Sequence, residues 1–413
     1  METQPKTKSH YAWRILIACC LINMSALGMT NSNGLFFSEI TKELGFKLSE
    51  LMIHCIFGGL TSAAVLFVVD RVYRKFPLKY VLIASFLLYH VPYMCMSTFH
   101  SVWQWCVAAM VNGIGGAFLL YIPVPMLLNN WFIKKKKMAL SICFVASGFS
   151  GILTSLLLGV LISNFGWRAA YVIRGAILLL LAVPGIILAV KTPAEMGLKP
   201  FGYGENAAED QRIKGAGEIY MRGREKRKKF YWCVALAVMC NLICAMTSLL
   251  PSYAATRGMS VVIASYLTSL AMAGNISSKA AMGPLTEKLG IRTSGIIVVS
   301  FLASGFLLIA AGMESLPFLV YASFTTGISA CANTLIIPNL LDTFAGGDEY
   351  VHMLSRCSTG TMFASAFSVT IGSTLYDSFG KFRPVFLIYG LLGLAIIAVL
   401  AIVFKPAKKE KAV

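Results

Sequence analysis

The chain has 413 residues, of which 57% are hydrophobic and 13% are charged, and its formal net charge is +18. This composition excludes a soluble protein, because there are too few polar residues to cover a surface that faces water. The basic residues lie in short links between long apolar runs, so we attribute the positive charge to membrane topology and expect no nucleic-acid partner.

The apolar runs are long enough to cross the ~30 Å hydrocarbon core of a bilayer. They lack the alternating pattern of barrel strands, and backbone amides inside a bilayer must pair within their own segment, so the runs are predicted to be helices. We predict an all-α integral membrane protein with twelve transmembrane helices, which are, in chain order, residues 12–37, 50–69, 78–97, 102–130, 138–163, 168–190, 230–253, 261–285, 293–313, 316–341, 352–377 and 383–404.

The predicted helices divide into two bundles of six. The N-terminal bundle is expected at 1–190, a cytoplasmic linker at 191–229, and the C-terminal bundle with a short basic tail at 230–413. The linker is rich in charged residues and glycine and has no apolar period, so we expect it to be solvated, with its basic end against anionic headgroups. The first apolar run is too long for a signal-peptide core and is expected to be a retained helix.

The distribution of basic residues predicts the orientation. If the N-terminus is cytoplasmic, most of the 36 Lys and Arg residues fall in cytoplasmic links, and those on the other side are Lys42, Lys47, Arg168, Arg257, Lys381 and Arg383. The positive-inside rule therefore predicts a multi-pass protein of the cell membrane with both termini in the cytoplasm. The 11 cysteines lie in apolar segments without a CxxC pair, so we expect neither disulfides nor a metal.

Two charged links repeat along the chain. Asp70-Arg71 follows the second predicted helix, and Glu287-Lys288 with Arg292 follows the eighth. The offset between the two acids is 217 positions, close to half the chain, as two duplicated six-helix halves would give. The alternative is that such acid-base pairs only cap the cytoplasmic ends of helices.

These links resemble the signature of the major facilitator superfamily, Gly-x-x-x-Asp-Arg-x-Gly-Arg-Lys, and its degenerate second copy. The second copy, which begins at Gly283, is better preserved, because the first has Leu66 and Tyr73 in place of glycines. The resemblance implies that the charges form a cytoplasmic latch in the outward-open state. The residues to which it assigns this gating are Asp70, Arg71, Glu287, Lys288 and Arg292.

Within that superfamily, the chain is similar to the monocarboxylate porters and the related oxalate-formate antiporters over nearly its full length. The segments that carry this similarity are 131–139, 146–151, 165–168, 193–198 and 338–344. The resemblance implies that substrate binds between the halves, near the middle of the membrane.

Lys279 is the main candidate for substrate binding. It lies deep in the eighth predicted helix, where an ammonium is costly unless an anion compensates its charge, and one turn earlier the chain has Asn275 instead of an acid. A substrate carboxylate would serve as the counterion, and the resembling families place a substrate-binding arginine here. The alternative is a lysine that snorkels to the cytoplasmic face or bonds to helix carbonyls.

Other candidates for the cavity are Asn31, His54, Tyr121 and Thr361. Asn31 lies in a polar stretch between Gly28 and Gly34, so the first helix can be bent and lined with donors, or the stretch can bond between helices. His54 is a group that titrates near neutral pH and can carry a proton or bond structurally. The resemblance implies that Tyr121 matches a pocket tyrosine, which can also be a packing aromatic, and that Thr361 lies near a second cation of the oxalate-specific relatives.

Three further polar residues in predicted helices are given structural roles. His90 is expected to bond structurally. Arg174 and Arg356 are expected to snorkel to headgroups from positions near the ends of their helices.

The sequence predicts a secondary active transporter that moves a small organic anion, in particular a monocarboxylate, by alternating access as a symporter or antiporter. The expected partners are this anion, a coupling proton or exchanged anion, and membrane lipids, and the protein is expected to be a monomer. No phosphate loop, H-E-x-x-H or Ser/His/Asp cluster is found, so we expect no enzyme activity and no cofactor. The alternatives are a carrier of a neutral amphiphile or drug on the same fold and a non-transporting membrane sensor.

Overall fold

The computed structural model describes residues 10–120, 122–203, 223–313, 315–345 and 347–404, and these ranges are almost entirely helical. The helices are α1 (Ala12–Asn31), α2 (Gly34–Leu44), α3 (Leu48–Lys75), α4 (Leu78–Cys95), α5 (Val102–Leu119), α6 (Pro123–Trp131), α7 (Lys136–Leu188), α9 (Gly223–Thr256), α10 (Val261–Ala310), α11 (Leu316–Cys331), α12 (Ile337–Asp342), α13 (Gly347–Phe379) and α14 (Phe382–Val403). A π-helical segment, Ala332–Ile336, joins α11 to α12.

Within the described residues, nine spans are long and apolar enough to cross a membrane. Two of them, in α7 and α10, contain a glycine with non-helical backbone angles, Gly166 with φ 75° and Gly290 with φ 76°, at which the chain changes direction. A positive φ is accessible to glycine at little steric cost. The prediction of an all-α membrane protein is confirmed, while the count of twelve helices stays a prediction.

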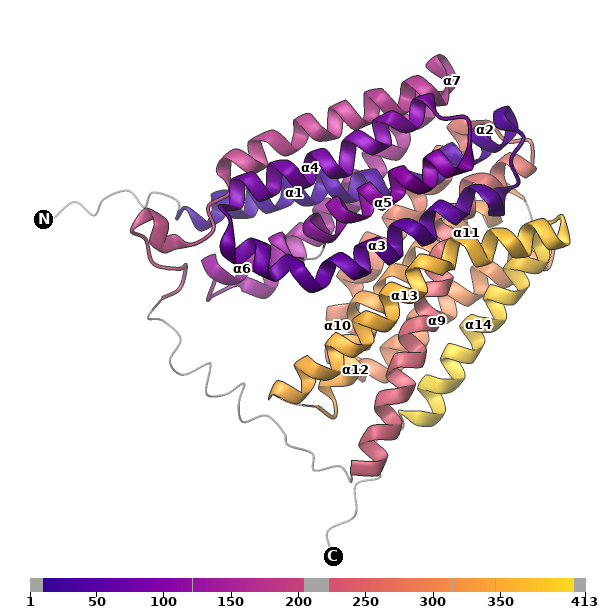
Figure 1. Cartoon of the computed structure of the whole chain (residues 1–413). Helices are drawn as coiled ribbons and strands as arrows, with labels where there is room; N and C mark the ends of the chain where they lie inside the picture. Colours follow the sequence, from indigo (N-terminus) through magenta and orange to yellow (C-terminus); the bar gives the residue numbers. More distant parts are fainter. Residues whose placement is uncertain (1–9, 121, 204–222, 314, 346, 405–413) are drawn as a thin grey trace, which may run out of the picture.

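The helices before residue 203 pack chiefly on one another, as do those after residue 223 (Figure 1). In the first group α7 packs on α1, and α5 packs on both α3 and α4. In the second group α10 packs on α11 and α14, and α9 packs on α13. The main contacts between the groups are α7 with α10, α3 with α13 and α2 with α9. The division into two bundles at the expected boundaries stays a prediction.

The two groups touch closely at one end, which we call the closed end. There the Ser49 amide donates to the Asp377 carboxylate over 2.8 Å, and the Thr370 hydroxyl donates to the Met52 carbonyl over 2.9 Å. The groups diverge toward the opposite end, which we call the terminal end because α1 begins and α14 ends there (Figure 1). The structure is therefore closed at one end and spread at the other.

The first span is broken at the closed end. α1 stops at Asn31 and α2 starts at Gly34, and in between the Ser32 hydroxyl donates back to the Gly28 carbonyl over 2.8 Å. Serine hydroxyls that bond to the preceding turn are known to bend helices. α2 then lies against α9 so closely that a Cβ on Gly34 would be 2.2 Å from the Ser248 carbonyl oxygen.

The start of the expected solvated linker differs from the prediction. Residues 191–203 fold back on the terminal end, where the Phe201 amide donates to the Trp131 carbonyl over 2.9 Å and the Phe201 ring contacts Trp13 and Phe132. The apolar ring explains the docking, because it removes exposed apolar area from water. The basic end of the linker is helical from Gly223, where α9 begins, and its place against headgroups stays a prediction.

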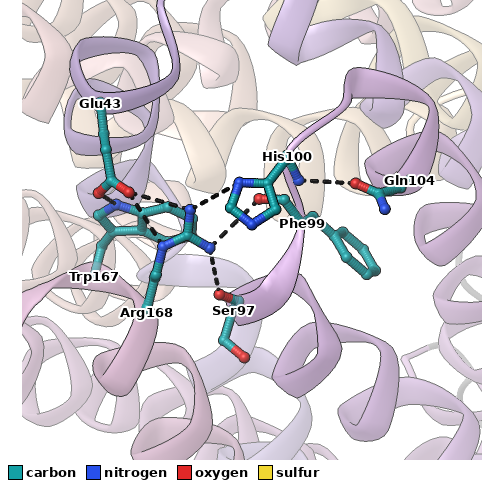
Figure 2. A network of polar contacts seen from close by, with 7 residues as sticks. All are labelled: Glu43, Ser97, Phe99, His100, Gln104, Trp167 and Arg168. Carbon is teal, nitrogen blue, oxygen red and sulfur yellow. Dashed lines mark hydrogen bonds and ion pairs between the residues drawn. The ribbon is translucent and has the colours of Figure 1, made fainter.

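A polar network at the closed end joins the last turn of α2, the kink of α7 and the segment between α4 and α5 (Figure 2). Arg168 forms an ion pair of 3.1 Å with Glu43, donates to the Ser97 carbonyl over 2.7 Å, and lies 3.4 Å from Nδ1 of His100. The indole N–H of Trp167 also donates to the Glu43 carboxylate. The central carbon of the Arg168 guanidinium lies 4.3 Å from the centroid of the Trp167 ring.

Replacing Glu43 tests how much this network contributes to the stability of the folded protein. Because the Glu43 side chain is 48% exposed, Glu43→Gln is expected to lower the free energy of unfolding by only about 0.5–1 kcal/mol. The measurement is the thermal unfolding midpoint of the purified protein. Glu39→Gln, one turn earlier and without an ion pair among the described contacts, is the matched control. Equal midpoints for both variants would show that the network contributes nothing.

Candidate functional site

Lys279 lies on α10 where this helix faces α7. Its side chain is half-buried, and its Nζ is 5.5 Å from the centroid of the Phe144 ring. In the described part of the chain, no carboxylate forms an ion pair with it. A cation–π contact contributes about 0.5–2 kcal/mol, less than the cost of removing an ammonium from water, so the positive charge is only partly compensated.

α7 and α10 run antiparallel along this part of the interface. A Cβ on Gly159 would be 2.2 Å from the Ser265 hydroxyl, and one on Gly148 would be 2.5 Å from Ile276. Lys279 comes one further turn along, on the side toward the terminal end. Beyond it the helix is more open, because a Cβ on Gly283 would meet nothing within 4 Å. We call this close contact between α7 and α10 the seam, and the ammonium lies where the seam ends.

Two asparagines from different groups lie along the same seam. A Cβ added at Gly151 of α7 would lie 3.2 Å from the side-chain nitrogen of Asn31 and 2.9 Å from Met272 of α10, so Asn31 lies where α1, α7 and α10 meet. Asn275, one turn before Lys279, has a buried side-chain oxygen without a hydrogen-bond partner. Lys279 and the Asn31 amide therefore offer a positive charge and a donor to an anion, whereas the Asn275 oxygen is an acceptor and does not contribute to binding a carboxylate.

The other predicted cavity residues are not brought to this point by any described contact. His54 is bonded within its own helix, with Nδ1 on the Leu51 carbonyl and Nε2 3.6 Å from the Cys55 sulfur. The Thr361 hydroxyl donates to the Ser358 carbonyl over 2.7 Å. Tyr121 lies outside the described residues. All three stay predictions.

The charged links lie at the terminal end. Arg71, Glu287 and Lys288 are exposed, and the Asp70 side chain lies outside the described residues. Arg292 donates to the Leu400 and Ala401 carbonyls over 3.1 and 2.6 Å, so it holds the last turn of α14. No ion pair between the two links is formed among the described side chains, and their role as a latch stays a prediction.

The prediction for Arg174 is wrong. Arg174 does not reach a membrane surface: its relative exposure is 0%, and its guanidinium is bonded to the break between α1 and α2. The polar residues at that break accept its hydrogen bonds, which explains why it turns inward. His90 is also fully buried and bonds to Ser25 and to the Phe86 carbonyl, in agreement with a structural role. Arg356 is exposed.

Sequence reasoning missed Phe144 as the partner of Lys279. A phenylalanine in an apolar helix gives no signal by itself, since lipid-facing and buried aromatics look alike in sequence. It also missed the π-helical segment between α11 and α12, a distortion that is frequent at functional sites. No group of three metal-ligating side chains occurs within the described ranges.

The architecture and the seam define a class of protein: a polytopic helical membrane protein in which a half-buried cation, without a carboxylate partner among the described side chains, lies between two helix groups that touch at one end. The sequence pattern of the Major Facilitator Superfamily matches residues 18–303 and 231–413. The chain therefore belongs to the Major Facilitator Superfamily, as its charged links predicted.

Individual proteins agree with this assignment. The chain is 24% identical to the MFS-type transporter pynF of Aspergillus niger over 80% of its own length and 73% of the relative's. It is 24% identical to monocarboxylate transporter 4 of Gallus gallus over 46% of the chain and 42% of that protein. The crystal structure of a D-xylose-proton symporter has the same fold, with a TM-score of 0.70 at 15% identity over 97% of this chain and 99% of that one.

Proposed function

We propose that this transporter carries a small organic anion, in particular a monocarboxylate, whose carboxylate binds Lys279. The observation that carries the proposal is a half-buried ammonium that has no carboxylate partner among the described side chains and lies where the seam between the two helix groups ends. A transported anion supplies the missing charge, and this compensation of a costly ammonium favours binding of anions over neutral solutes.

The resemblance to monocarboxylate transporters supports this substrate class. The alignment with the Gallus gallus protein spans less than half of that protein, so the substrate comes to this chain only as part of the proposal. The Phe144 ring beside the ammonium favours an anion with an apolar body over a compact dianion, since one face of the site is apolar and Lys279 is the one cation that contacts this ring among the described residues.

The proposed mechanism is alternating access. The two helix groups would rock about the Lys279 region, closing one end while the other opens, and the charged links at the terminal end would close in the opposite state. The basic links and both termini are proposed to face the cytoplasm of a cell, which makes the structure described above the inward-facing state.

The test is uptake of radiolabelled carboxylates by proteoliposomes that contain the purified full-length protein. The panel holds acetate, lactate, pyruvate, oxalate and a neutral analogue of each acid, with and without an imposed pH gradient or an anion inside the vesicles. Uptake of monocarboxylates above that of protein-free vesicles is expected, and the pH gradient and internal anion separate symport from exchange. Uptake of the neutral analogues alone would overturn the proposal in favour of a neutral amphiphile.

A further inference from the structure

Arg174 is a buried cation inside the first helix group. Its Nη1 donates to the Met29 carbonyl and the Ser32 hydroxyl, each over 3.2 Å, and to the Asn33 side-chain oxygen over 2.8 Å. Its Nε and Nη2 are buried and have no hydrogen-bond partner. No carboxylate forms an ion pair with it in the ranges that the structure describes.

Aromatic rings surround the guanidinium. Its central carbon is 4.6 Å from the centroid of Phe36, 5.3 Å from that of Tyr171 and 5.5 Å from that of Tyr93. Such contacts contribute about 0.5–2 kcal/mol each, while a buried charge without an anion costs more, so the rings do not complete the site. Ring faces also cannot replace the in-plane acceptors that N–H groups require.

The geometry of the unbonded groups points to an anion. Nε and Nη2 are the two donors on one edge of the planar guanidinium, and that edge presents parallel N–H bonds to a carboxylate or a halide. The N-terminus of α2, a helix of 11 residues, begins next to Asn33 and adds its positive dipole end to the same region. Two sources of positive potential therefore meet at one pair of free donors.

We propose that the Nε–Nη2 edge of Arg174 binds one small monovalent anion, of the size of chloride or formate, inside the first helix group. This site is distinct from that of Lys279, and the inference does not rest on the proposed function. The bound anion neutralises Arg174 and stabilises the break between α1 and α2, on which Arg174 holds Ser32 and Asn33.

The test measures the thermal unfolding midpoint of the full-length protein in detergent, while chloride or formate replaces gluconate at constant ionic strength. The midpoint of the unmodified protein is expected to rise by a few degrees and to saturate, because a ligand of the folded state stabilises it. Arg174→Gln is expected to abolish the rise. Asn33→Asp places a carboxylate beside Arg174, so the midpoint in gluconate should increase and the response to added anion should disappear.

Two controls separate this site from other arginines and from the transport site. Arg168→Gln removes an arginine that already has Glu43 as its partner, so the midpoint should fall while the anion response remains. Lys279→Gln should also keep the response to chloride. A response to formate alone indicates a carboxylate ligand, and one to chloride alone an inorganic ion; both support the site. The absence of a saturable response in the unmodified protein would overturn the proposed site. A response that survives in Arg174→Gln would do the same. If Arg174→Gln does not fold, a response that survives in Asn33→Asp would overturn the site instead.

Discussion

Lys279→Ala is expected to reduce carboxylate uptake at least ten-fold. The variant removes the charge that is proposed to bind the carboxylate, and a hydrogen bond to a charged group is worth about 1.5–3 kcal/mol, which corresponds to roughly ten- to a hundred-fold in affinity. Uptake of each accepted anion into proteoliposomes, measured over a range of concentrations, is the readout. The loss should be visible as a higher half-saturating concentration and a lower rate at low substrate.

Two control variants make this result specific. Lys228→Gln neutralises an exposed lysine at the start of α9 and should leave uptake unchanged. Lys279→Arg keeps the positive charge and should retain part of the activity. Phe144→Leu should alter the preference among acids of different apolar size more than it alters the total uptake. Unchanged transport of every accepted anion by Lys279→Ala would remove Lys279 from the site.

Gly34→Ala is expected to reduce uptake roughly ten-fold or more while leaving the protein folded. The added Cβ would be 2.2 Å from the backbone oxygen of Ser248, which cannot move aside as a flexible side chain can. Overpacking of this kind costs about 1–3 kcal/mol, and here the cost falls on the closed end of the state described above. The transport cycle would then favour the opposite state and slow down.

The control for this variant is Gly360→Ala. There the new Cβ would be 3.5 Å from the nearest atom, a Val234 methyl, which is an ordinary contact. This variant should transport normally and unfold at the usual temperature. If Gly34→Ala transported as fast as Gly360→Ala, the contact between α2 and α9 would not have to close during transport.

Much of the fold could be predicted from the sequence. The lengths of the apolar runs fix helices of membrane-spanning size, because only internal hydrogen bonding satisfies a backbone in lipid. The links at Asp70 and Glu287 were sufficient to predict the superfamily, which the match over residues 18–303 and 231–413 confirms. Lys279 was singled out because it interrupts an apolar run of the sequence, where a lysine is costly.

Other features were decided only by the tertiary structure. A helix in a membrane is apolar both where it faces lipid and where it faces protein, so the sequence does not say that Phe144 meets Lys279. For the same reason Arg174 looked like a residue that snorkels to the surface. Its inward direction depends on the Ser32–Asn33 break between α1 and α2, whose acceptors are distant in sequence and are brought to Arg174 only by packing. The sequence determined that this protein spans a membrane and carries cations within apolar helices, whereas packing between distant helices decided which of these cations are buried and which side chains they meet.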